Sequence, residues 1–340
     1  MIETEKENRL NPPENKTSWQ FWLGISLSIG CSVLALWGID IEQVVNALKD
    51  INWWNISVAL FAVTLVLFLK THRWTVLLGL KSFDPFNQVF KRLVEGAFLN
   101  TFLPARLGDL ARVVLLGEEL KMHKAYILGT IILEKTFDLL AVGLAVVYLF
   151  FKIDFPDWMV RPAQTIFILL VGVLLVSGFV YWLDQKQNQK LNHWVRKTPF
   201  LQKVSEQWGL LVSSFKQLRD PVRIFKVSAW TLIINFIGLI PIYFVLVAMN
   251  IELPIWTMLF LWVVLQIGIA VPSSPGRVGV FHYVVVLGLL YFNIERSAAL
   301  AYAVVLHLCI YLPLVILGAI VVGRDKMIWQ KMGDLIHGKN

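Results

Sequence analysis

Two short segments of the chain share a pattern centred on an arginine. The sequences PARLG at 104–108 and PGRVG at 275–279 both read P-x-R-x-G, and each interrupts an apolar stretch. Proline ends an incoming helix and glycine permits a tight turn, while the next helix offers unpaired N–H groups and the positive end of its dipole. Arginine beside such an end suits phosphate. We therefore expect Arg106 and Arg277 to flank a site for an anionic headgroup. The alternative is that each is a structural partner or extends to an interface.

The first of these turns is the stronger candidate, because other polar residues lie near it in the sequence. Asn100, Asp109 and Arg112 are all within six residues of Arg106. We include all four in the predicted substrate site.

A further pair of charges lies inside a long apolar run. Glu134 and Asp138 are four residues apart, so they share one face of a helix. Charges at membrane depth are costly and usually face a cavity or a partner. One interpretation pairs them with Arg106 or Arg112 as a gate, or makes them a proton site. The other places Glu134 near the cytoplasmic interface.

The sequence gives no indication of enzymatic chemistry. It has no Walker loop, no H-E-x-x-H and no G-x-S-x-G, and its two cysteines lie in apolar runs without metal-ligand spacing. We therefore expect no catalytic residue, no metal and no cofactor.

Composition indicates an integral membrane protein. Of 340 residues, 57% are hydrophobic and 16% charged, and the mean hydropathy is +0.66. Soluble domains have about 45–50% apolar residues and about 25% charged residues. This excludes an ordinary cytosolic enzyme, a disordered chain and a disulfide scaffold. The net charge of +8 indicates cytoplasmic loops and contact with an anionic lipid surface, not nucleic acid.

The apolar runs predict the architecture. A span needs about 20 apolar residues, and runs of that length occur at 19–38, 53–72, 127–151, 164–183, 227–249 and 298–322. The stretches 86–117 and 255–292 are broken near the middle by Pro, Gly and Arg. We expect each to be a re-entrant hairpin.

Positive charge orients the chain. With the N-terminus inside, 25 of the 31 Lys and Arg lie on inner segments and five on outer ones. This predicts a multi-pass protein of the cell membrane with cytoplasmic tails at 1–18 and 323–340 and an outside loop at 152–163. Within the cytoplasmic segment 184–226, an amphipathic pattern favours a helix on the inner leaflet over one packed on neighbouring loops.

The two hairpins also predict an internal repeat. At an offset of 171, seven of fourteen positions from 104 and from 275 are identical. Each half, 19–151 and 164–322, would contain three spans and one hairpin. Because three is odd, the second half enters the membrane inverted, as in many secondary transporters. The expected fold is thus an all-α polytopic membrane protein with an inverted repeat, unless the similarity is accidental.

The same motifs carry a family resemblance. NTFLPARLGDLAR at 100–112, EKTFDL at 134–139 and PSSPGRVGVF at 272–281 resemble the lysylphosphatidylglycerol synthase transmembrane-domain family, the flippase-like half of the multiple peptide resistance factor. The resemblance spans about residues 19–322. It implies lipid translocation or a related role in envelope lipids, without lysyl transfer. The family usually has Arg, Gly and an acid where this chain has Lys135, Arg277 and His282.

The function predicted first is therefore a flippase or transporter for an anionic or phosphate-bearing lipid, which binds at the two hairpin tips. The second is an accessory or catalytic membrane subunit in lipid or glycan synthesis, with residues 184–226 holding a partner. The third is a scaffold that transports nothing. A membrane-protein partner and a homo-oligomer are both compatible with the sequence.

Overall fold

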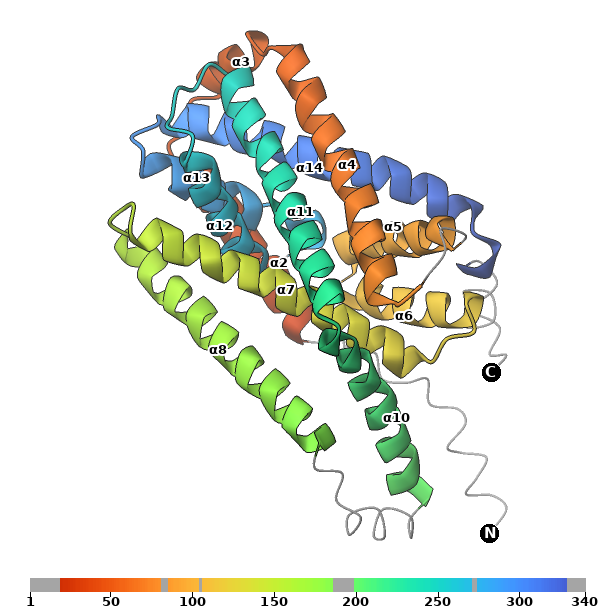
Figure 1. Cartoon of the computed structure of the whole chain (residues 1–340). Coiled ribbons are helices and arrows are strands. Elements are labelled where there is room, and N and C mark those ends of the chain that lie inside the picture. The colour runs from red at the N-terminus through yellow and green to blue at the C-terminus, as the bar shows by residue number, and fades with distance from the viewer. Residues whose placement is uncertain (1–18, 81–84, 104–105, 186–198, 271–273, 329–340) are drawn as a thin grey trace, which may run out of the picture.

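The computed structural model describes residues 19–80, 85–103, 106–185, 199–270 and 274–328. The predicted N-terminal tail and most of the C-terminal tail lie outside these ranges. The helices are, in order, α2 (Trp19–Leu36), α3 (Ile41–Lys49), α4 (Trp53–Leu77), α5 (Phe86–Phe102), α6 (Leu107–Glu119), α7 (Lys124–Phe150), α8 (Asp157–Gln185), α10 (Pro199–Phe215), η2 (Lys216–Arg219), α11 (Pro221–Ala248), α12 (Thr257–Ala270), η3 (Pro275–Arg277), α13 (Val280–Leu290) and α14 (Arg296–Arg324) (Figure 1).

The described part of the chain is all helical, which confirms the predicted fold class at this level. A helix covers each of the six predicted apolar runs, and each interrupted stretch forms two shorter helices. By length and apolar character, α4, α11 and α14 can cross a membrane, and α2 with α3, bent by 82°, adds a broken fourth. The 27-residue α7 is long enough, but besides Lys124 at its start it carries three charges in its interior, at 134, 135 and 138.

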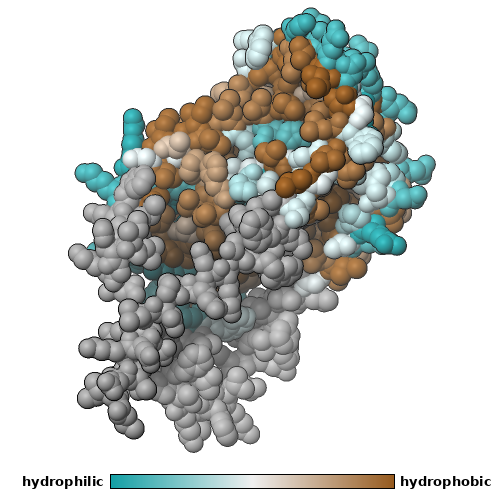
Figure 2. All heavy atoms as spheres, turned by 180° about the vertical axis from the view of Figure 1, so that it is seen from behind, coloured by the Kyte–Doolittle hydropathy of each residue, from teal (hydrophilic) through white to brown (hydrophobic). Residues whose placement is uncertain are grey.

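The surface agrees with a membrane setting. Large apolar side chains are exposed along many helices, including Phe61, Phe167, Phe225 and Phe236. Hydrophobic residues cover much of the face seen in Figure 2, and hydrophilic ones gather towards its edges. Such continuous apolar exposure is what a lipid-facing surface requires.

Helices α4 and α11 form a long antiparallel pair in the middle of the molecule (Figure 1). The backbone N–H of Asn52, just before α4, donates to the carbonyl of Ala248 at the end of α11, at 3.0 Å. Asn52 also caps α4 through Trp54 N, and Asp220 caps α11 through Val222 N. One hydrophobic core lies among α11 to α14, and a second lies among α4 to α7.

Helix α14 supports both interrupted elements. Phe98 of α5 packs against Gly318, the carbonyl of Gly276 in η3 is bonded to His307, and Arg277 reaches Tyr311. Since α5 runs antiparallel to α14, its end approaches η3, and α5 and η3 are in contact. The two helix breaks therefore lie near the middle of the same long helix.

Helix α10 occupies part of the segment 184–226. Its C-terminal part packs on α7, where Ser214 lies against Gly129, so this part contacts a helix and not a loop. Residues 186–198 lie outside the described ranges.

The close approach of α5 and α6 gives a test of the hairpin. A Cβ at Gly108 would overlap the carbonyl of Gly96 and lie 2.7 Å from the backbone N of Asn100. We expect Gly108→Ala to lower the melting temperature in detergent by several degrees, because backbone atoms cannot move aside as a flexible side chain can. Gly238→Ala, whose Cβ meets nothing within 4 Å in the interior of α11, is the control. Equal melting temperatures for the two variants would contradict this packing.

Candidate functional site

The centre of the candidate site is the guanidinium of Arg73, near the end of α4. Its side chain is fully buried. Nη1 donates to Asp138 Oδ1 at 2.6 Å and to Thr231 Oγ1 at 3.0 Å, and Nη2 donates to Asp138 Oδ2 at 3.3 Å. This two-pronged geometry is the strongest arrangement for an arginine and a carboxylate. It joins α4, α7 and α11.

Glu134 extends the network by lying between two guanidinium groups. One of its carboxylate oxygens is 3.7 Å from Arg73 Nη2, and the other accepts from Arg112 Nη2 at 3.3 Å. Arg112, on α6, also lies over the ring of Trp74 at 4.7 Å. Of the interpretations offered by the sequence, the structure thus pairs Glu134 with Arg112 and buries it.

The network continues to the break between α5 and α6. Arg112 Nε is 3.4 Å from Asp109 Oδ1, and Asn100 Nδ2 donates to the same oxygen at 3.1 Å. Five predicted residues are therefore joined through one connected set: Asn100, Asp109, Arg112, Glu134 and Asp138. Sequence reasoning missed Arg73 and Thr231, since position 73 falls just beyond the apolar run that ends at 72.

Arg106 is placed differently. It occupies the N-cap of α6 with a left-handed backbone, φ 55°, and its side chain is exposed. Among the residues that the structure describes, it has no ion-pair partner. Its neighbours along the chain, Phe102, Leu103, Leu107 and Leu110, are exposed apolar residues. The first turn thus combines an exposed cation with exposed apolar residues close to it in the sequence.

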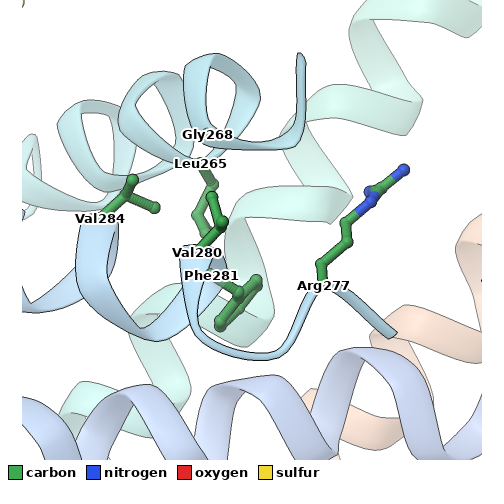
Figure 3. A pocket seen from close by; sticks show the side chains of 6 residues that line it. All are labelled: Leu265, Gly268, Arg277, Val280, Phe281 and Val284. Carbon is green, nitrogen blue, oxygen red and sulfur yellow. The ribbon is translucent and has the colours of Figure 1, made fainter. Parts of the chain in front are cut away.

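Arg277 lies at the second break and is also left-handed, with φ 57°. Its Nη1 donates to the Tyr311 hydroxyl at 3.3 Å. A narrow crevice beside it is otherwise apolar, and the guanidinium extends away from the side chains of Val280 and Phe281 (Figure 3). Arg277 is not part of the Arg73 network.

A second buried ionic cluster surrounds Arg92 on α5. It contacts Glu95 at 2.7 Å, Glu119 of α6 at 2.6 Å and Asp325, which ends α14. Lys91 binds the other oxygen of Asp325 at 3.0 Å. This cluster fixes both arms of the first hairpin to the end of α14.

Neither cluster is arranged to hold a metal. Within the described ranges, no group of three or more His, Cys, Asp and Glu side chains has the geometry of a cation site. Each carboxylate in the two clusters faces an arginine or a lysine instead.

The Arg73 pair predicts a stability effect. Arg73→Met leaves Asp138 and Glu134 with fewer compensating charges, and we expect it to destabilise the fold by about 3 kcal/mol, at the lower end for a buried pair because Asp138 is partly exposed. The double variant Arg73→Met/Asp138→Leu should recover part of this loss. Unfolding by sodium dodecyl sulfate in mixed micelles measures both.

Lys135→Ala is the matched control. Its ammonium is 3.6 Å from Glu134, but its side chain is 44% exposed, so its removal should change stability less than the loss of the buried Arg73. A double variant that is no more stable than Arg73→Met alone would argue against the pair.

Comparison with known proteins places this chain in a family. The lysylphosphatidylglycerol synthase TM region matches residues 21–318. A UPF0104 membrane protein of Methanocaldococcus jannaschii is 29% identical over 228 residues, which cover 66% of this chain and 92% of that protein. No solved structure matches. The match spans both interrupted elements and the whole charge network, so the chain belongs to the family of the lysylphosphatidylglycerol synthase TM region.

Proposed function

We propose that this protein moves a lipid with an anionic, phosphate-bearing headgroup across the cell membrane, without a chemical step on the lipid. The observation that carries the proposal is the turn at Arg106. Arg106 is exposed there just before a 13-residue helix, and Phe102, Leu103 and Leu107, its neighbours along the chain, are exposed apolar residues. A lipid has the complementary parts, an anion and apolar chains.

The backbone around Arg106 adds to its attraction for anions. The first N–H groups of α6 have no partner within the helix, and its dipole is positive at that end. A phosphodiester at this turn would meet the guanidinium and these N–H groups, while its acyl chains contact residues such as Phe102 and Leu107. The headgroup would thus leave water without losing its hydrogen bonds.

The Arg73 network provides a second stage for the same headgroup. The Nε atoms of Arg73 and Arg112, and Oδ1 of Asn100, are buried without a hydrogen-bond partner among the described residues. Each arginine is already balanced by Glu134, Asp109 or Asp138. A phosphate that displaces one of these carboxylates would exchange one ion pair for another, which makes the network suitable as a gate next to Arg106.

An inverted repeat would give this site its counterpart. The first residue of α12 lies 171 positions after the first residue of α5, and the last residue of α13 lies 171 positions after the last residue of α6. The left-handed positions Gly79 and Asn250, and Arg106 and Arg277, have the same separation. Helices α4 and α11, which correspond in this register, are antiparallel. These features support two re-entrant hairpins from opposite faces and alternating access by rocking of the halves.

We base the proposed orientation on the residues at one end of the molecule. The end of α6, the start of α5 and the end of α14 meet at the Arg92 cluster. Four basic residues lie near these helix ends: Lys121 just after α6, Lys124 at the start of α7, Arg324 at the end of α14 and Lys326 just after it. This supports cytoplasmic termini, with the basic segment 184–226 near the anionic inner leaflet. A second copy and another membrane protein remain the proposed partners.

Lipid movement in proteoliposomes tests the proposal. We expect the protein to expose fluorescent phosphatidylglycerol from the inner leaflet to a quencher added outside, and Arg106→Ala to slow this movement at least about tenfold, because a charge-assisted contact is worth about 1.5–3 kcal/mol. Arg161→Ala, an exposed arginine on α8, should leave the rate unchanged. Circular dichroism and melting temperature confirm that both variants are folded.

Two results would count against the proposal. If a folded Arg106→Ala variant moves lipid at the unchanged rate, Arg106 is not part of the lipid site. Absence of lipid movement in the unmodified protein, together with capture of a membrane-protein partner that depends on residues 184–226, would favour the accessory subunit.

A further inference from the structure

Two histidines that are distant in sequence meet beside the second helix break. The rings of His282 on α13 and His307 on α14 have centroids 4.9 Å apart. His307 also stacks on Tyr311 at 4.5 Å, and both histidines contact the ring of Phe281. The pair is partly buried. Tyr311 links it to Arg277, because its ring stacks on His307 and its hydroxyl accepts a hydrogen bond from Arg277.

The hydrogen bond of His307 shows which of its nitrogen atoms is free to take a proton. Its Nε2–H donates to the carbonyl of Gly276, inside the η3 turn, at 2.8 Å. A carbonyl oxygen only accepts, so the neutral ring must have its hydrogen on Nε2 and a lone pair on Nδ1. Protonation at Nδ1 would place a positive charge beside the turn without breaking this bond.

The surroundings of the pair are cationic or neutral. Arg277 is hydrogen-bonded to Tyr311, whose ring stacks on that of His307. Helix α12 has no titratable side chain, and α2 has only Cys31. On the other packed elements, several titratable groups have partners elsewhere: Arg73 with Asp138, Arg92 and Glu95 in the Asp325 cluster, and Lys49 with Asn46. His72 packs on Trp230 and Tyr243 on Phe244. Glu42 lies in the first turn of α3, Lys70 lies on α4, and Tyr283 follows His282 on α13. Among the described residues, no carboxylate contacts either ring.

This arrangement lacks the negative charge that a protonated pair would need. Two imidazolium rings 4.9 Å apart repel each other strongly in an apolar setting, and Arg277 repels both. One proton on the pair becomes favourable when an anion is held at the same turn. Each of the two, anion and proton, therefore increases the affinity for the other.

We infer that Arg277, His282 and His307 form an anion site at the second helix break, where a lipid phosphodiester binds together with one proton on the histidine pair. The inference rests on the proposed function and specifies its second site. The proton comes from solvent and goes to an imidazole lone pair, so a monoanion and a proton enter as a neutral couple. Binding should strengthen as the pH falls through the range where imidazole titrates.

Calorimetric titration of the purified protein in detergent tests this inference. The probe is dihexanoyl phosphatidylglycerol below its critical micelle concentration, because its phosphodiester keeps one negative charge between pH 5.5 and 7.5. We expect about tenfold tighter binding at pH 5.5 than at pH 7.5, within the usual range of coupling between sites. Parallel titrations at pH 6.5 in two buffers of different ionisation enthalpy should reveal net proton uptake of up to one per lipid.

Variants locate the effect. His307→Asn retains an amide donor for Gly276 but cannot take the proton, and the double variant His282→Asn/His307→Asn should lose both the proton uptake and the pH dependence while still binding at pH 7.5. His72→Asn, a histidine on α4 that packs on Trp230, should keep both and is the matched control. Melting temperatures show whether each variant is folded.

The outcomes separate this inference from the proposed function. Lipid binding with the same affinity at all three pH values and without proton uptake would overturn the inference and leave the proposed function standing. No lipid binding at any pH would overturn both. Dimethyl phosphate, a soluble phosphodiester, should bind much more weakly; equal affinity would assign the site to a free anion and overturn the lipid assignment.

Discussion

A guanidinium that is fully buried among apolar helices can remain charged only if acids lie beside it. For Arg73 these are Asp138 and Glu134, four residues apart on α7. The cost of an unpaired charge in such a setting is several kcal/mol, so the position of α7 against α4 is strongly constrained. Thr231 brings α11 to the same point, and the first break, α4 and the second half of the chain are linked through one set of contacts.

The helix breaks obey a related constraint on the backbone. Lipid offers no hydrogen bonds, so interrupted backbone is tolerated only where protein surrounds it. At the second break, Ser274 N donates to Ser28 Oγ at 2.7 Å and the Gly276 carbonyl accepts from His307. At the first, α5 and α6 approach until Gly96 and Gly108 are in backbone contact. Helix α14 contacts both α5 and η3, so the same helix packs beside both breaks.

The two breaks share backbone geometry but differ in chemistry. Near the first, each buried arginine that the structure describes has a carboxylate partner, and Arg106 is exposed next to exposed apolar residues of the sequence. Near the second, Arg277 has a tyrosine partner, and the ring of that tyrosine stacks on one of two adjoining histidines. In the proposed function, a headgroup would meet acids paired with arginines near the first break, and an arginine with two histidines near the second. The two breaks therefore differ in the residues that could meet a charged ligand.

The sequence by itself determined the helical segments and their interruptions, because both depend on local properties. About 20 apolar residues define a span, and Pro and Gly near the middle of a run break it; the runs at 86–117 and 255–292 each contain two short helices. Charge spacing also placed Glu134 and Asp138 on one face of α7.

Only the tertiary structure decided which charges meet. Arg73 and Asp138 are 65 residues apart, Arg92 and Asp325 are 233 apart, and the two histidines lie on different helices. Helical periodicity states which side chains share a face, but it does not state which face of another helix packs there. That choice depends on the packing and charge compensation of all the helices together, and so Arg73 and the histidine pair could not be assigned from the sequence.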